Sequence, residues 1–167
     1  FGIVVAFMNL AFYLAINEVP LGSSVAIEFI GPIAVAAIGT RTARNAAALG
    51  LTVAGILLLA TVTPDMSTAG LAYTLLAGTL WAGYIVLGQR VALSGLAVDG
   101  LGIGMAVGAV AITPFGTGAL SPGFDRPWLL AAAAATGLLS NAIPYALDQV
   151  VLQRIDRTRF ALLLALL

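Results

Sequence analysis

Long apolar blocks separated by short polar stretches run along the whole chain. A helix that crosses a lipid bilayer needs about 20 mainly apolar residues, with about 17 to 25 tolerated. By this criterion the pattern predicts seven transmembrane segments, the first and last incomplete, at 1–17, 23–40, 46–63, 69–90, 101–120, 128–153 and 158–167. Proline, glycine, aspartate and serine gather between the segments, as is typical of helix ends.

Membrane-spanning strands are the competing interpretation of these blocks. Transmembrane strands alternate polar and apolar residues, whereas the block AALGLTVAGILLLA, residues 47–60, does not alternate. We therefore predict an all-α fold, a polytopic membrane helix bundle.

The composition agrees with a lipid environment. Hydrophobic residues make up 61% of the 167 residues and charged residues 8%, and the mean hydropathy is +1.09. This apolar share exceeds that of ordinary globular domains, so we expect the lipid bilayer as a partner. The formal net charge is zero and the basic residues are dispersed, which argues against nucleic acid as a partner.

Residue types common in catalysis are missing from the chain. It contains no cysteine and no histidine, which excludes thiol nucleophiles, thiolate metal sites and the commonest general base. No phosphate loop, nucleophile elbow or zinc-binding helix motif is present. We expect no catalytic residue, no metal site and no cofactor, and we do not expect an enzyme.

The arginines are distributed unevenly between alternate loops, and such a bias indicates which loops face the cytoplasm. One set of loops and helix ends holds six arginines, while the other set holds only Arg126. The six are Arg41, Arg44, Arg90, Arg154, Arg157 and Arg159. This bias places residue 1 on the cytoplasmic side. Because the sequence starts at Phe1 and stops inside the apolar run ALLLALL, we expect a fragment of a longer protein.

Two distant stretches echo each other. Asn9 is followed by Tyr13, and Asn141 is followed by Tyr145, each pair before a polar turn and a further apolar helix. The first stretch would run outward from the cytoplasm and the second would run inward. Such inverted repeats are characteristic of secondary transporters.

The carboxylate of Glu28 interrupts the apolar run AIEFIGP, residues 26–32. It would lie about 9 Å inside its helix at 1.5 Å per residue, too deep to reach the headgroups comfortably. A carboxylate at this depth needs a bundle interior, a partner or a proton. Pro32 breaks or kinks the helix and frees the carbonyl oxygen of Glu28, as is tolerated where a helix lines a cavity.

A second proline lies in NAIPYALD, where Pro144 frees the carbonyl of Ser140. Three polar residues there follow an i, i+4, i+7 spacing that places them on one helical face: Asn141, Tyr145 and Asp148. Trp81 and Tyr84 lie three residues apart in the middle of the segment 69–90.

Structural interpretations of these residues remain open. The asparagines could serve as hydrogen-bonding contacts between helices, and Tyr145 and Asp148 could lie near an interface. Trp81 and Tyr84 could simply pack, and Glu28 could share a proton in a structural bond. Gly104 and Gly108 form a GxxxG pair, which indicates close helix packing.

Two stretches carry a family resemblance. NLAFYLAINEVPLGSSVAIEFIGPIAVAAIGTR, residues 9–41, closely resembles helices three and four of EamA-type transporters of the drug/metabolite transporter superfamily, in particular the inner-membrane threonine and homoserine exporters. NAIPYALDQVVLQRIDRTRFALLLALL, residues 141–167, resembles the matching stretch of the second half. The resemblance implies a ten-helix protein of two inverted repeats. Residues 1–68 would end the first repeat, and residues 69–167 would begin the second, up to the start of helix nine.

The resemblance implies a multi-pass protein of the inner (plasma) membrane that exports small amino acids, threonine-like or homoserine-like, or related metabolites. We expect alternating access with protons as the coupling ion, and Glu28 as the proton-responsive or amine-binding carboxylate. Asp148 is a candidate for the inner gate. Neutral side chains would hydrogen-bond the substrate or shape the cavity wall: Asn9, Tyr13, Asn141, Tyr145, Trp81 and Tyr84. The alternative is a non-transporting membrane scaffold, or an integral membrane enzyme with its chemistry outside this chain.

Overall fold

The computed structural model describes residues 1–40, 42–59 and 66–164, without the side chains of 59 and 117–125. Within these ranges the chain is helical and contains no strand, which confirms the all-α prediction. Arg41 and parts of two predicted segments, 60–63 and 165–167, lie outside the described residues. The helices are α1 Gly2–Ile16, α2 Leu21–Glu28, α3 Ile30–Gly39, α4 Ala43–Leu59, α5 Thr68–Leu93, α6 Ala97–Asp125, α7 Pro127–Gly137, the π-helical turn η1 Leu138–Ala142, α8 Ile143–Leu152 and α9 Arg157–Leu164.

The helices match the predicted apolar segments one by one. The segment 23–40 corresponds to α2 and α3 together, and 128–153 corresponds to α7, η1 and α8. Some boundaries differ: α4 begins at Ala43 and α6 at Ala97, a few residues before the predicted starts, and the predicted loop 121–127 is helical as far as Asp125. Backbone amides near a bilayer are best satisfied by hydrogen bonds within a helix, so a helix can run on through polar residues there.

Four described stretches are long and apolar enough to cross a membrane: Leu21–Gly39, Thr68–Leu93, Ala97–Gly116 and Pro127–Leu152. The helices α1 and α4 are also apolar but shorter, with 15 and 17 residues. Large apolar side chains point outward, including Ile38 at 83% exposure and Leu58 at 87%. Water would disfavour such a surface and lipid would not, so the described part of the chain is a partial polytopic membrane bundle.

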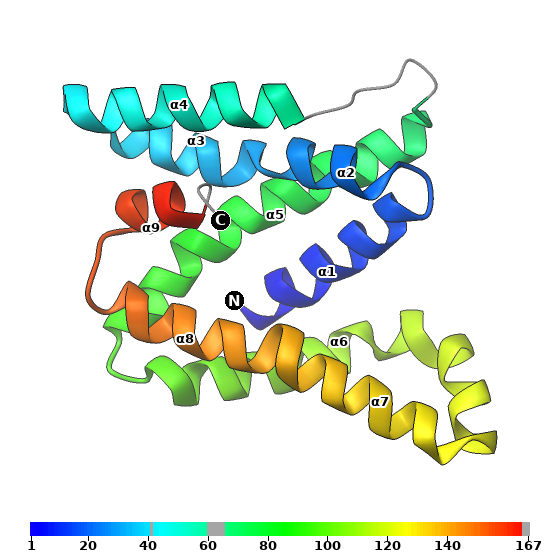
Figure 1. The fold of residues 1–167 in the computed structure, drawn as a ribbon. Coiled ribbons are helices and arrows are strands. Elements are labelled where there is room, and N and C mark those ends of the chain that lie inside the picture. Colours follow the sequence, from blue (N-terminus) through cyan, green and yellow to red (C-terminus); the bar gives the residue numbers. More distant parts are fainter. Residues whose placement is uncertain (41, 60–65, 165–167) are drawn as a thin grey trace.

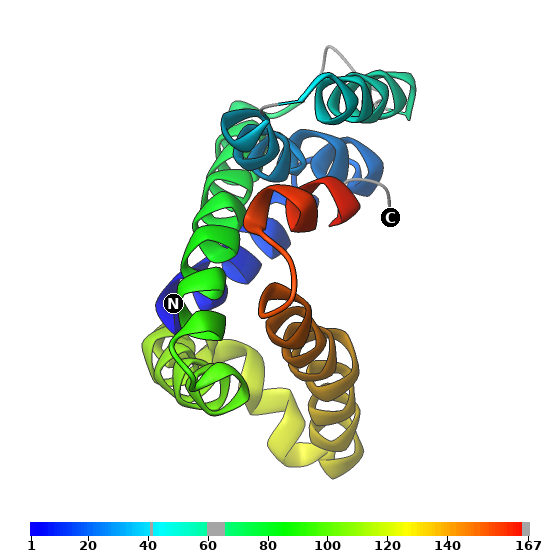
Figure 2. The ribbon, with the colours of Figure 1, turned by 90° about the vertical axis from the view of Figure 1, so that its left-hand side faces the viewer.

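The helix α5 is the centre of the bundle. It packs against α1, α2, α3, α6, α8 and α9. Figures 1 and 2 show α5 running obliquely between the layer formed by α2, α3 and α4 and the pair formed by α6 and α8. Consecutive helix ends alternate between the two sides in Figure 1: α3, α5 and α8 end at the left, and α1, α4 and α6 end at the right. This alternation agrees with the order of loops on which the arginine bias depends.

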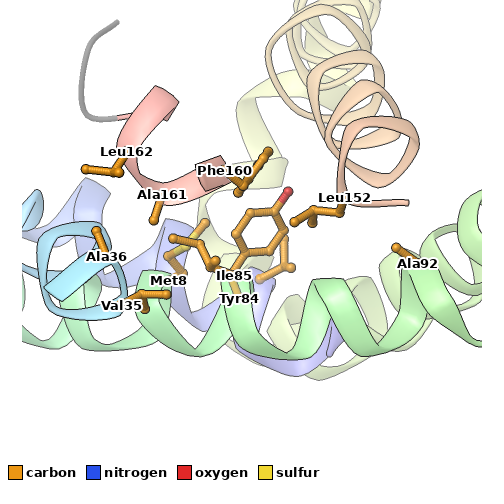
Figure 3. Close-up of a cluster of buried hydrophobic side chains, with 11 residues drawn as sticks. Met8, Val35, Ala36, Tyr84, Ile85, Ala92, Leu152, Phe160, Ala161 and Leu162 are labelled. Atoms are coloured by element: carbon orange, nitrogen blue, oxygen red, sulfur yellow. The ribbon is translucent and has the colours of Figure 1, made fainter. Parts of the chain in front are cut away.

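A cluster of buried side chains joins α5 to α8 and α9. Ile85 is completely buried, and Tyr84 and Leu152 are each 1% exposed. Figure 3 shows the Tyr84 ring rising from α5 between Phe160 of α9 and Leu152 of α8. Burial of a large aromatic side chain among apolar neighbours fixes the positions of these helices relative to α5.

Glycines allow two pairs of helices to approach at the backbone. A Cβ added at Gly108 of α6 would lie 2.7 Å from the carbonyl oxygen of Gly2 in α1, and a Cβ at Gly2 would overlap the backbone of Gly104. The GxxxG pair therefore packs α6 against α1. The second approach joins α5 to the α2–α3 segment, where a Cβ at Gly31 would overlap the carbonyl oxygen of Gly78.

We predict that the Gly78→Ala substitution lowers the stability of the whole protein in detergent. A Cβ at Gly78 would lie 2.7 Å from the carbonyl oxygen of Glu28. The backbone of Glu28 cannot relieve this contact by a change of rotamer, as a side chain could. Overpacking of this kind costs about 1 to 3 kcal/mol. Thermal unfolding should therefore begin at a lower temperature.

The matched control for this prediction is Gly83→Ala on the same helix. A Cβ at Gly83 would lie 3.5 Å from Cγ1 of Val4, an ordinary contact. Equal melting temperatures for the two variants would show that the backbone contact at Gly78 is not tight.

Candidate functional site: a polar cavity at the helix break

The helix break lies next to Glu28. The helix α2 ends at Glu28 and α3 begins at Ile30, so the single residue Phe29 interrupts the segment. Pro32 is buried in the first turn of α3, where the missing N–H costs no intrahelical hydrogen bond. The carbonyl oxygen of Glu28 comes close to Gly78, so the contact with α5 lies directly at the break.

A cavity of about 360 Å³ opens beside this break. Its volume is at the lower end of the range of small-molecule sites. Its lining comes from α1, α2, α5, α8 and α9: Met8, Asn9, Phe12, Glu28, Trp81, Tyr84, Pro144, Tyr145, Asp148 and Leu164. Six of the predicted site side chains and Pro144 are thus brought together from segments far apart in the sequence. We call this space the polar cavity.

Glu28 is a buried residue whose carboxyl group has no hydrogen-bond or ion-pair partner in the described part of the chain. The residue is 8% exposed, and no hydrogen bond or ion pair to its side chain occurs among the described residues. A structural bond, the alternative interpretation of this residue, is therefore not seen in the described part of the chain. Because a buried unpaired carboxylate is costly, such a group is expected to bind a proton or a cationic ligand.

The carboxyl group of Asp148, in contrast, is held by α5. The hydroxyl of Tyr84 donates to Oδ2 of Asp148 at 2.6 Å. The Tyr84 ring also lies 5.2 Å from the ring of Tyr145 and 5.7 Å from that of Phe1, measured between centroids. Tyr84 therefore packs in the core and also orients a carboxyl group of the cavity.

A hydrogen bond between α1 and α8 forms part of the cavity wall. The amide Nδ2 of Asn9 donates to the hydroxyl of Tyr145 at 3.1 Å and to the carbonyl oxygen of Val5 at 2.9 Å. Asn9 and Tyr145 also line a second, mainly apolar cavity of about 640 Å³ between α1, α6, α7 and α8. This pair is therefore the partition between the two cavities.

Tyr13 and Asn141 lie in the wall of the second cavity and not in that of the polar cavity. The i, i+4, i+7 spacing predicted a common face for Asn141, Tyr145 and Asp148. Asn141 shares the wall of the second cavity with Tyr145, and Tyr145 shares the wall of the polar cavity with Asp148. Asn141 lies in the π-helical turn η1, in which the N–H of Ile143 donates to the carbonyl oxygen of Leu138. A π turn contains more residues than an α turn, so the spacing from Asn141 to the residues that follow departs from that of a regular α-helix.

Sequence reasoning did not identify several residues of the site. Met8 and Phe12 line the polar cavity from α1, and Leu164 lines it from α9. Phe29, at the helix break, packs on Trp81 with ring centroids 5.1 Å apart. The helical spacing of Met8 and Phe12, i and i+4 beside Asn9, was the available signal for the first two.

The described residues include no group of three or more acidic side chains that could hold a metal ion. Polar chemistry in the cavity consists of two carboxyl groups, one amide, two phenol hydroxyls and one indole N–H. This set can bind a proton or a polar small molecule, and the aromatic rings can cover an apolar part of it.

Comparison with known proteins shows similarity to named exporters. The chain is 36% identical over 173 residues to the threonine/homoserine exporter RhtA of Salmonella typhimurium (strain LT2) and to that of Escherichia coli (strain K12). These alignments cover 99% of this chain and 57% of each relative, so the chain spans a little over half the length of the relatives it matches. No protein-family model matches the chain. No solved structure matches it.

We predict energetic coupling between Asn9 and Tyr145. The single variants Asn9→Leu and Tyr145→Phe each remove the hydrogen bond between α1 and α8, so the double variant should lose less stability than the sum of the two. Interhelical hydrogen bonds in membrane proteins contribute about 0.6 kcal/mol on average and up to about 1.7. Unfolding of the four proteins in detergent measures this coupling.

The control cycle combines Asn9→Leu with Tyr84→Phe, because the hydroxyl of Tyr84 donates a hydrogen bond to Asp148 and not to Asn9. That cycle should be additive. Equal coupling in both cycles would contradict a specific bond between Asn9 and Tyr145.

Proposed function

We propose that the protein is a membrane transporter that exports small amino acids, threonine-like or homoserine-like, or related metabolites. The relatives are named threonine/homoserine exporters, and the similarity extends over nearly the whole of this chain. We further propose the inner (plasma) membrane as its location and the EamA type of the drug/metabolite transporters as its family. The observation that carries the proposal is the buried Glu28 in a small polar cavity, where its carboxyl group has no partner among the described residues.

The proposed mechanism is alternating access between two inverted repeats, with residues 1–68 belonging to the first and 69–167 to the second. The polar cavity supports this division because its lining comes from both parts of the chain. The hydrogen bond between Asn9 and Tyr145 also joins the two parts. A bond of this strength can break and form again during a transport cycle.

The proposed roles follow from the contacts. Glu28 binds the coupling proton or the substrate amine, and Asp148, oriented by Tyr84, belongs to the same cavity. Trp81, supported by Phe29, forms the aromatic wall. Tyr13 and Asn141 act from the second cavity, on the far side of the Asn9–Tyr145 pair.

A membrane scaffold or an integral membrane enzyme is the alternative function. A scaffold would not require polar groups to converge on a cavity, and the similar proteins are named exporters. Both observations favour transport.

We predict that everted membrane vesicles containing the whole protein take up labelled threonine and homoserine when a proton gradient is imposed. The Glu28→Gln variant should lose this gradient-dependent uptake, because an amide cannot take up and release the proton. Uptake with and without the gradient is the measurement.

The matched control is Glu18→Gln, since Glu18 is an exposed acid in the turn between α1 and α2. It should transport as the unmodified protein does. If Glu28→Gln kept the full rate with unchanged pH dependence, the role proposed for Glu28 would be wrong, and if neither amino acid entered the vesicles, the proposed substrates would be wrong.

A further inference from the structure

The hydrogen-bonding groups that face the polar cavity are mainly acceptors. Both amide hydrogens of Asn9 are engaged, one by Val5 and one by Tyr145, so the group that Asn9 has left for a ligand is its carbonyl oxygen. Tyr84 donates its hydroxyl hydrogen to Asp148. The carboxyl of Glu28 receives no hydrogen bond from any described residue.

Donors are scarce in the same space. The side chains that line the cavity include no arginine and no lysine. Tyr145 still has its own hydroxyl hydrogen, and Trp81 has its indole N–H. The other lining side chains, Met8, Phe12, Pro144 and Leu164, have no hydrogen to donate in a conventional hydrogen bond.

An ammonium group complements this arrangement. It brings three N–H donors and a positive charge, which suit two carboxyl groups and an amide oxygen. The aromatic rings of Trp81, Tyr84 and Tyr145 also line the cavity, and the faces of such rings attract cations. A ligand carboxylate, in contrast, would find no basic side chain in the described lining to bind it.

We propose that the polar cavity recognises the ammonium group of its ligand and is indifferent to the carboxylate. Small primary amines that lack a carboxylate are then ligands of this protein alongside amino acids. This inference rests on the proposed function, because it takes the polar cavity as the substrate site.

Two compounds related to threonine separate the contributions of its ammonium group and its carboxylate to binding. 1-Amino-2-propanol keeps the amine and the hydroxyl but lacks the carboxylate, whereas 3-hydroxybutyrate keeps the carboxylate and the hydroxyl but lacks the amine. Binding of each compound and of threonine to the purified whole protein is measured by titration calorimetry. We expect dissociation constants for threonine and 1-amino-2-propanol within about threefold of each other, and binding of 3-hydroxybutyrate weaker by about thirtyfold or more.

The variant Glu28→Gln should weaken binding of 1-amino-2-propanol by about tenfold or more, and the exposed control Glu18→Gln should not change it. Binding of 3-hydroxybutyrate as tight as that of the amine, or no binding of the amine, would overturn the proposal. Because the two compounds are compared on the unmodified protein, the proposal can be tested even if a variant fails to fold.

Calorimetry also separates this inference from the proposed function. A protein that binds the amine but moves no threonine into vesicles would refute export and leave the amine site standing. A protein that transports threonine but does not bind the amine would refute the amine site alone.

Discussion

The backbone contact between the α2–α3 break and α5 is the constraint on which the rest of the site depends. Gly31 and Gly78 allow the two backbones to meet without side chains between them. This contact holds the broken segment against the central helix, where the carbonyl oxygen of Glu28 lies close to Gly78. The carboxyl of Glu28 then lines the cavity from α2, while Phe29 packs on Trp81 of α5. Since Glu28 and Phe29 are adjacent at the break, a shift of the segment would displace the acid together with the ring that contacts Trp81.

The polar cavity contains two carboxyl groups that differ in whether a hydrogen bond from another side chain holds them. Asp148 is oriented by the hydroxyl of Tyr84, which is itself fixed in the buried cluster on α5. Glu28 has no such restraint among the described residues. A group that must bind and release a ligand needs freedom of this kind, because a strong internal partner would compete with the ligand. The partition formed by Asn9 and Tyr145 adds a breakable contact between the two cavities.

Much of the fold could be predicted from the sequence because the length of an apolar block decides whether a helix can span a membrane. Glu28 and Pro32 could be singled out from one sequence because an acid and a proline are both unfavourable inside an apolar transmembrane helix. The π-helical turn η1 could not be predicted, because helical spacing assumes a constant 3.6 residues per turn and η1 departs from it. The hydrogen bond from Asn9 to Tyr145 and the ring contact between Phe29 and Trp81 join segments far apart in the sequence, and no local pattern predicts such contacts.

The central claim is that the carboxyl group of Glu28, at the helix break, meets the substrate. Infrared difference spectra of the whole protein, recorded with and without threonine, measure this most directly. The account predicts that threonine changes the carboxyl and carboxylate bands and that these changes disappear in Glu28→Gln. Identical difference bands in the unmodified protein and in Glu28→Gln would show that threonine does not reach Glu28, and would contradict the account.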